Sequence, residues 1–176
     1  MSILTKKFFE RPTLKVAQEL LGKFLFRRIG GKKFFFAITE VEAYDGFLDK
    51  ASHAHKGKTA RNTPMFGEAG IWYVYLVYGM HNMLNIVTGP KNYPAAVLIR
   101  VIKPLSNSVA KLNGPAKLTK FLGIDKKFNK KPATRAAGLW IEDKGVKIKK
   151  SQIKASPRIG VNYAGEWKDK NYRFYL

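Results

Sequence analysis

The feature that most constrains the fold is a pair of strand-forming segments separated by two adjacent glycines. Residues 23–29 and 34–41 are rich in aromatic and β-branched side chains, which favour an extended backbone. Gly30 and Gly31 lie between them and can adopt the positive φ angles that tight hairpin turns require. The pattern predicts an antiparallel hairpin whose second strand delivers Glu42 at its end.

Further segments of the same kind predict a larger sheet. Residues 71–78 and 83–87 are expected to form a second hairpin, and residues 96–102 a strand that follows it. Shorter strands are expected near residues 139–141, 159–161 and 172–175. Hairpins in succession pair antiparallel, so the sheet should be mainly antiparallel.

Apolar spacing and terminal signals predict three helices. The first uses Thr13 as its N-cap and ends before Gly22, and the others cover residues 108–112 and 115–122. The lysine-rich residues 126–131 are expected to form a solvated loop. We therefore predict one domain, residues 1–176, of mixed α/β (α+β) class, with a curved, mainly antiparallel sheet, flanking helices and a protruding β-hairpin.

A long connection separates the two hairpins. Residues 45–70 are rich in Gly, Lys, His, Asn and Pro and show no periodicity. Connections in compact domains are seldom this long unless they carry function. We expect residues of the functional site in this loop.

The charge of the chain indicates a polyanionic partner. The sequence has 25 lysines, 8 arginines and a formal net charge of +21. Lysine is suited to attracting phosphate without reading base edges, so binding of nucleic acid regardless of sequence is the leading interpretation. The alternative is that the lysines serve solubility or reflect genome composition.

Other features of the composition narrow the possible chemistry and location. With no cysteine, the chain can form no disulfide, thiolate-held iron–sulfur cluster or cysteine-ligated zinc site. No apolar run approaches the roughly 20 residues that cross a bilayer, and residues 1–7 do not resemble a signal peptide. We expect a soluble intracellular protein without cofactor or membrane partner, in the cytoplasm or nucleoid of a prokaryote or in the nucleus of a eukaryote.

Three clusters of polar and aromatic residues stand out: TEVEAYDG at residues 39–46, ASHAHKGKTARNTPMFG at 51–67 and YVYLVYGMHNMLN at 73–85. In this order and spacing they resemble the alkyladenine (3-methyladenine) DNA glycosylase family. The resemblance continues in LIRVIKPL at 98–105, NGPAKL at 113–118 and RIGVNYAGEW at 158–167, and thus covers nearly the whole chain. It implies a monofunctional DNA glycosylase of base excision repair, which flips alkylated or deaminated purines from duplex DNA, hydrolyses the N-glycosidic bond and leaves an abasic site.

The resemblance assigns catalytic roles to Glu42 and Arg100. Glu42 would take a proton from the water that attacks the sugar, and Arg100 would help to hold that water. Without the resemblance, a glutamate in so basic a chain would more often pair with a surface lysine.

Four further residues match the base pocket of the family. Tyr44, His53 and Tyr75 would enclose the extruded purine, and electron-rich aromatic faces would favour a positively charged alkylated base by about 1–2 kcal/mol. Asn85 would crowd the exocyclic amino group of guanine. Taken alone, Tyr75 would be a packing residue and His53 a solvated loop residue. His53 and His55 have no third ligand motif, so no metal site is expected.

The resemblance also implies contacts with DNA. Tyr78, at the predicted hairpin tip, would intercalate at the gap left by the flipped nucleotide, although it could instead pack on its neighbours. Thr59, Arg61 and Asn62 are candidates for the DNA backbone, but Arg61 could equally be a plain loop arginine. Asn82 and Ala60 depart from the family, which commonly has an aromatic residue and a proline at these positions.

Two other classes remain as alternatives. A non-catalytic basic nucleic-acid-binding protein would account for the charge and the 13% aromatic content but leaves Glu42 unexplained. A small-molecule hydrolase or formyl-transfer enzyme of similar sheet architecture would show no salt-sensitive affinity for DNA. We expect a monomer that acts on double-stranded DNA containing damaged purines.

Overall fold

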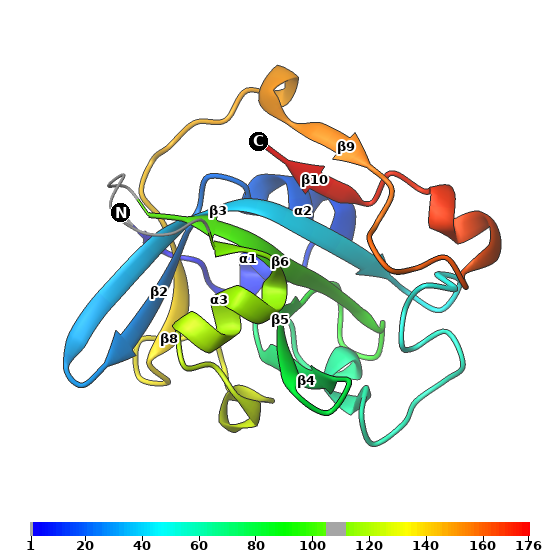
Figure 1. Ribbon diagram of the computed structural model, residues 1–176, viewed down its shortest axis with the longest axis horizontal. Helices are drawn as coiled ribbons and strands as arrows, with labels where there is room; N and C mark the ends of the chain where they lie inside the picture. Colours follow the sequence, from blue (N-terminus) through cyan, green and yellow to red (C-terminus); the bar gives the residue numbers. More distant parts are fainter. Residues whose placement is uncertain (1, 105–111) are drawn as a thin grey trace.

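A ten-stranded antiparallel sheet is the framework of the protein (Figure 1). The computed structural model describes residues 2–104 and 112–176. Its strands are β1 (Ser2–Ile3), β2 (Phe24–Ile29), β3 (Lys32–Asp45), β4 (Trp72–Val77), β5 (His81–Val87), β6 (Ala95–Lys103), β7 (Leu112–Asn113), β8 (Leu139–Asp143), β9 (Lys154–Ser156) and β10 (Arg173–Tyr175). Its helices are α1 (Lys6–Phe9), α2 (Thr13–Leu20) and α3 (Pro115–Phe121), with 3-10 turns η1 (Thr63–Phe66), η2 (Lys126–Phe128), η3 (Lys150–Gln152) and η4 (Gly165–Asp169).

The order of the strands confirms both predicted hairpins and the mixed α/β class. The main path is β1-β8-β2-β3-β6-β5-β4, and β10 pairs with β3 beyond the end of β2. Strand β3 therefore lies at the centre and is paired along both edges. The hairpin of β4 and β5 projects from the lower part of the molecule in Figure 1.

The core lies between the sheet and the helices packed on it. Helix α2 contributes Val16, Ala17 and Leu20, which are fully buried because they share one face of the helix. Helix α3 contributes Leu118 and packs against β5 and β6. The burial of these apolar side chains supplies most of the free energy that holds the helices to the sheet.

An irregularity in the pairing of β3 with β6 changes which side chains face the core. Glu40 pairs with Val101 and Val41 with Ile99, so Arg100 has no residue directly opposite it. This extra residue is a β-bulge, which redirects a side chain and bends the strand. The guanidinium of Arg100 is thereby aimed toward the carboxylates of β3.

Several boundaries differ from the sequence predictions. Thr13 is the first residue of α2 and not its N-cap. The N-cap is Pro12, whose backbone angles are not helical. The Thr13 hydroxyl instead accepts a hydrogen bond from that of Thr88, at 3.3 Å. Glu42 lies inside β3 and not at its end, because the pairing with β6 continues to Asp45.

The second half of the chain also differs from the sequence predictions. Residues 159–161 form a turn and not a strand, because Gly160 has a φ of 78°, and β9 lies earlier in the chain. Residues 126–131 are not simply a solvated loop, since η2 buries Phe128. The predicted helix at 108–112 falls mostly outside the described residues, and Leu112 begins β7.

The packing of α2 predicts that two Leu→Ala substitutions will differ greatly in their effect on the free energy of unfolding. Leu20→Ala should lower the free energy of unfolding by about 2–5 kcal/mol, because it leaves a cavity under the helix. Leu48→Ala, at a side chain that is 77% exposed, should change it by less than about 0.5 kcal/mol. Urea unfolding of the two variants measures both values, and equal effects would contradict the docking of α2 on the core.

Candidate active site

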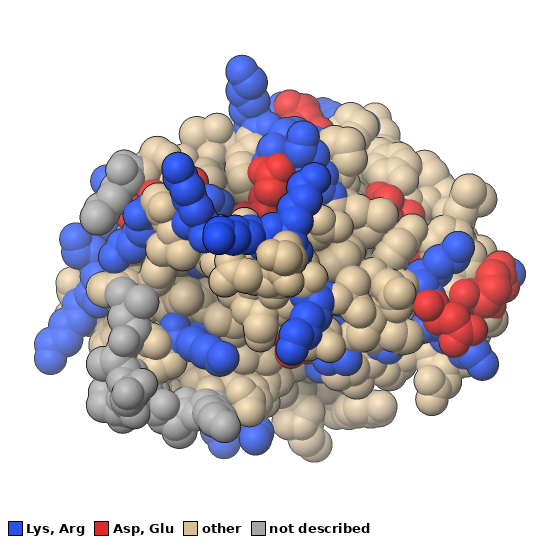
Figure 2. Space-filling model, turned by 90° about the horizontal axis from the view of Figure 1, so that it is seen from above, with Lys and Arg blue, Asp and Glu red and all other residues tan. Residues whose placement is uncertain are grey.

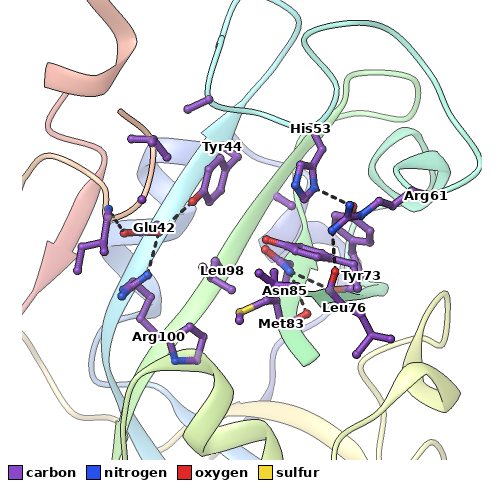
Figure 3. Close-up of a pocket in the computed structure, with 18 of the residues that line it drawn as sticks. Glu42, Tyr44, His53, Arg61, Tyr73, Leu76, Met83, Asn85, Leu98 and Arg100 are labelled. Atoms are coloured by element: carbon purple, nitrogen blue, oxygen red, sulfur yellow. Dashed lines mark hydrogen bonds and ion pairs between the residues drawn. The ribbon is translucent and has the colours of Figure 1, made fainter. Parts of the chain in front are cut away.

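A cavity of about 660 Å³ opens where β3 to β6 meet the loop 45–70 and the turn after β9. The predicted site residues that line it are Glu42, Tyr44, His53, Arg61, Tyr75, Tyr78, Asn85 and Arg100. Figure 3 shows Glu42, Tyr44 and Arg100 on one side of this space and His53, Arg61, Tyr73 and Asn85 on the other. Residues far apart in sequence are thus brought together around one cavity.

The carboxylate of Glu42 is buried and held by three donors. The main-chain N–H of Ile159 donates to Oε1 at 2.8 Å. The hydroxyl of Tyr44 and Nη1 of Arg100 donate to Oε2, at 3.0 and 3.3 Å (Figure 3). A buried carboxylate is tolerated only with such partners, so the orientation of Glu42 is strongly determined.

Arg100 bridges two carboxylates of the same strand. Its Nε donates to Oε1 of Glu40 at 3.1 Å, while its Nη1 contacts Glu42. Arg173, from β10, also donates to Glu40, at 3.2 Å. Glu40 and Glu42 lie two residues apart on one face of β3, and the bulge at Arg100 places the guanidinium beside both.

A second ion pair adjoins this part of the site. Arg158 and Asp49 are both fully buried, and the two carboxylate oxygens of Asp49 accept from Nη1 and Nη2 of Arg158, at 2.5 and 2.8 Å. Nη1 also donates to the carbonyl of Ala43 at 2.8 Å. The pair fixes the residue that precedes Ile159, and so the donor to Glu42. The sequence predictions named neither residue. Arg158 lies in the motif at residues 158–167, but Asp49 lies in no motif that stood out.

Aromatic side chains form the remaining wall. The rings of His53 and Tyr75 meet edge to face at 4.6 Å between centroids, and Tyr73 lies 5.0 Å from Tyr75. Burial raises the pKa of the hydroxyls of Tyr44, Tyr73 and Tyr75, so all three remain protonated and can donate hydrogen bonds.

His53 is uncharged at neutral pH. Its Nδ1 lies 3.0 Å from the hydroxyl of Tyr73. Although the ring is exposed in the open cavity, surrounding protein atoms desolvate it, and the positive charge of Arg61 adds to this effect. Together they lower the pKa of His53 from 6.5 to about 4.

Asn85 and Tyr78 lie on the β4–β5 hairpin. Asn85 is buried at the cavity wall, where its Nδ2 donates to the carbonyls of Tyr73 and Met83, at 3.1 and 3.2 Å. Tyr78 is 89% exposed at the hairpin tip. Its φ of 51° and that of Gly79, 71°, form a tight turn of the kind that matches the twist of the strands. The ring therefore projects from the protein without packing on a neighbour.

The three candidates for DNA-backbone contact have different environments. Asn62 is buried, and its side chain donates to the carbonyls of His53 and Gly57 and accepts from the N–H of Thr59. It braces the loop and does not face solvent. The Arg61 guanidinium lies over the ring of Tyr75 and donates to the carbonyl of Leu76 at 2.7 Å, whereas Thr59 is exposed.

The described part of the chain shows no group of three or more His, Asp or Glu residues placed to hold a metal ion. Among residues 2–104 and 112–176, no helix has both the length and the apolar character needed to span a membrane.

A family model and several known proteins are similar to this chain over nearly its whole length. Residues 7–176 match the model of the family described as methylpurine-DNA glycosylase. Proteins named "Putative 3-methyladenine DNA glycosylase" from Methanocella arvoryzae and Legionella pneumophila (strain Lens) are 45% and 43% identical to this chain. The alignments cover 99% and 100% of this chain and 92% and 95% of the relatives. A protein of the same name from Wolbachia pipientis is 45% identical over 98% of this chain and 93% of its own length.

The environment of His53 predicts that its ring gains a proton only at acidic pH. In an NMR titration of the folded protein, the His53 ring should change protonation near pH 4, and Arg61→Met should raise this midpoint because it removes a nearby cation. Since the folded pKa lies below the unfolded value of 6.5, the contribution to stability is present above pH 6.5 and is lost as the pH falls toward 4. A midpoint near 6.5 would contradict this description of the pocket.

Proposed function

Because the chain belongs to the methylpurine-DNA glycosylase family, we propose that it releases damaged purines from duplex DNA with water activated by Glu42. Membership makes the protein a DNA glycosylase, a hydrolase of base excision repair. The observation that carries the proposal is the position of Glu42, a buried carboxylate with fixed orientation at the wall of an aromatic-lined cavity.

Glu42 is suited to act as a general base. As water attacks the anomeric carbon, a carboxylate oxygen accepts its proton, and the glycosidic electron pair leaves with the purine. Arg100 touches the same carboxylate oxygen as the Tyr44 hydroxyl, and its remaining guanidinium hydrogens can orient the water. The donation from Ile159 keeps the carboxylate from rotating away from this geometry.

The reaction should stop at an abasic site. A glycosylase that also cuts the strand commonly needs an amine to attack the sugar. Among the described residues that line the cavity, none is a lysine. This composition supports a monofunctional enzyme that uses water as its only nucleophile.

The cavity can receive an extruded purine. Tyr44 comes from one side and His53 from the other (Figure 3), and Tyr75 packs edge to face against His53. This arrangement leaves aromatic surfaces for the two faces of a base. Asn85 would lie near the edge of the base, where its fixed amide would crowd an exocyclic amino group. We propose 3-methyladenine, 7-methylguanine and hypoxanthine as the class of substrates.

The surface is suited to a DNA duplex. Lys and Arg outnumber Asp and Glu 33 to 12, and basic side chains spread over the face shown in Figure 2, the upper side of Figure 1. Such a distribution attracts phosphates regardless of base sequence. We propose that the protein acts as a monomer, since Glu42, Arg100 and the proposed base-pocket residues line one cavity without a second copy of the chain.

Glu42→Gln should abolish excision while DNA binding is retained. The amide keeps the shape of the side chain but cannot take a proton, so the single-turnover rate on duplex DNA containing hypoxanthine should fall by about 100-fold or more. Glu166→Gln, at an exposed glutamate paired with Lys50, is the control and should leave the rate unchanged. Comparable excision by Glu42→Gln would remove Glu42 from the mechanism, and no free base from the unmodified protein would favour a binding protein without catalysis.

Tyr78→Ala should weaken DNA binding and base flipping together. Without the ring nothing fills the gap left by the flipped nucleotide, so unstacking would cost a few kcal/mol without compensation. Tyr78→Phe keeps the ring and should behave as the unmodified protein. Fluorescence of 2-aminopurine placed beside the lesion reports flipping, and an unaltered signal in Tyr78→Ala would exclude the intercalating role of Tyr78.

A further inference from the structure

Guanidinium groups lie over two of the tyrosine rings that line the cavity. The guanidinium carbon of Arg61 is 5.1 Å from the ring centroid of Tyr75, and that of Arg158 is 4.8 Å from the ring centroid of Tyr44. One face of each ring is therefore already used by a cation. The sequence prediction that these rings would attract a positively charged base did not include either neighbour.

The two arginines differ in how their charge is balanced. Arg158 is neutralised by its buried pair with Asp49 and does not line the cavity. Arg61 does line the cavity, and no carboxylate among the described residues forms an ion pair with it. Its guanidinium is held by a neutral acceptor, the carbonyl of Leu76. The positive charge of Arg61 therefore acts on whatever the cavity contains.

The remaining charges of the lining do not cancel that of Arg61. Glu42 carries the one carboxylate among the described lining residues, and Arg100 lies against it. His53 is neutral, with its pKa lowered to about 4, partly because of the charge of Arg61. The field of Arg61 thus reaches the aromatic wall that would contact the base. In a cavity from which a bound base displaces water, charges interact more strongly than in bulk solvent.

We propose that Arg61 determines specificity by favouring purines without net charge over cationic purines. Deaminated purines such as hypoxanthine are neutral in DNA, whereas a purine methylated at N7 or N3 carries a positive charge on its ring. A cationic base against Tyr75 would meet a ring whose other face already holds a guanidinium, and it would be repelled by that guanidinium. This proposal rests on the proposed function, since it concerns the choice among damaged purines.

The test compares two substrates in the same sequence context. Single-turnover kcat/KM is measured on duplexes containing either hypoxanthine or 7-methylguanine. Arg61→Met removes the charge and keeps an unbranched side chain. It should raise the ratio of 7-methylguanine to hypoxanthine excision by about fivefold or more. Arg61→Lys retains the charge and should keep the ratio near that of the unmodified protein.

Lys58→Met is the matched control. It removes a positive charge from the same loop, but Lys58 lies over Phe66, and neither residue lines the cavity. This variant should weaken binding of both duplexes equally and leave the ratio unchanged.

Each outcome decides between explanations. An unchanged ratio in Arg61→Met, with both rates lowered equally, would overturn the proposal and identify Arg61 as a phosphate contact. A lower ratio would overturn it as well. Failure of the unmodified protein to release either base would instead refute the proposed function, so the two failures are distinguishable.

Discussion

The antiparallel pairing of β3 with β6 is the constraint on which the rest of the structure depends. Phe36 and Ile38 face the core, and beyond the irregularity Val41 and Ala43 do so as well. In an uninterrupted strand Ile38 and Val41 would point to opposite faces. The irregular register thus changes the alternation within β3, so that the second half directs Glu42 and Tyr44 toward the cavity while the apolar side chains stay buried.

The site also shows how charge is maintained inside a small domain. Taking carboxylates and guanidinium groups out of water is costly, and the cost is offset only when nearly every polar atom has a partner. Glu42 and Asp49 both meet this condition, through side-chain donors and main-chain N–H groups. Arg158 nearly does so, because only its Nε is buried without a partner. Since these partners come from β3, β6, the long loop and the turn after β9, the site is ordered only when the whole domain is folded.

Much of the fold could be predicted from sequence because its signals are local. Glycines between runs rich in aromatic and β-branched residues identified the hairpins of β2–β3 and β4–β5, and Gly114, Pro115 and Gly123 marked the ends of α3. Elements whose existence depends on distant contacts were missed. The η2 turn buries Phe128 in a lysine-rich segment whose composition is typical of a solvent-exposed loop. Residues 154–156 form β9 only because β10 pairs with them.

The same distinction holds for the site. Family resemblance pointed to residues that the structure places around one cavity, from Glu42 to Arg100. The contacts by which other residues hold or modulate them carry no signal in the sequence. Arg158 and Asp49 are 109 residues apart, and nothing in either segment indicates the pairing. Arg61 was a candidate for the DNA backbone, with a plain loop arginine as the alternative, and only the folded chain reveals it against Tyr75.

The backbone conformation of Tyr78 has an energetic cost in the free protein. A residue with a side chain loses roughly 1–2 kcal/mol in the left-handed conformation, a penalty that glycine avoids and asparagine reduces. The ring is 89% exposed, so its burial offsets little of this cost. If the ring fills a gap in DNA as proposed, the free protein bears this conformational cost in exchange for an interaction that forms only in the complex.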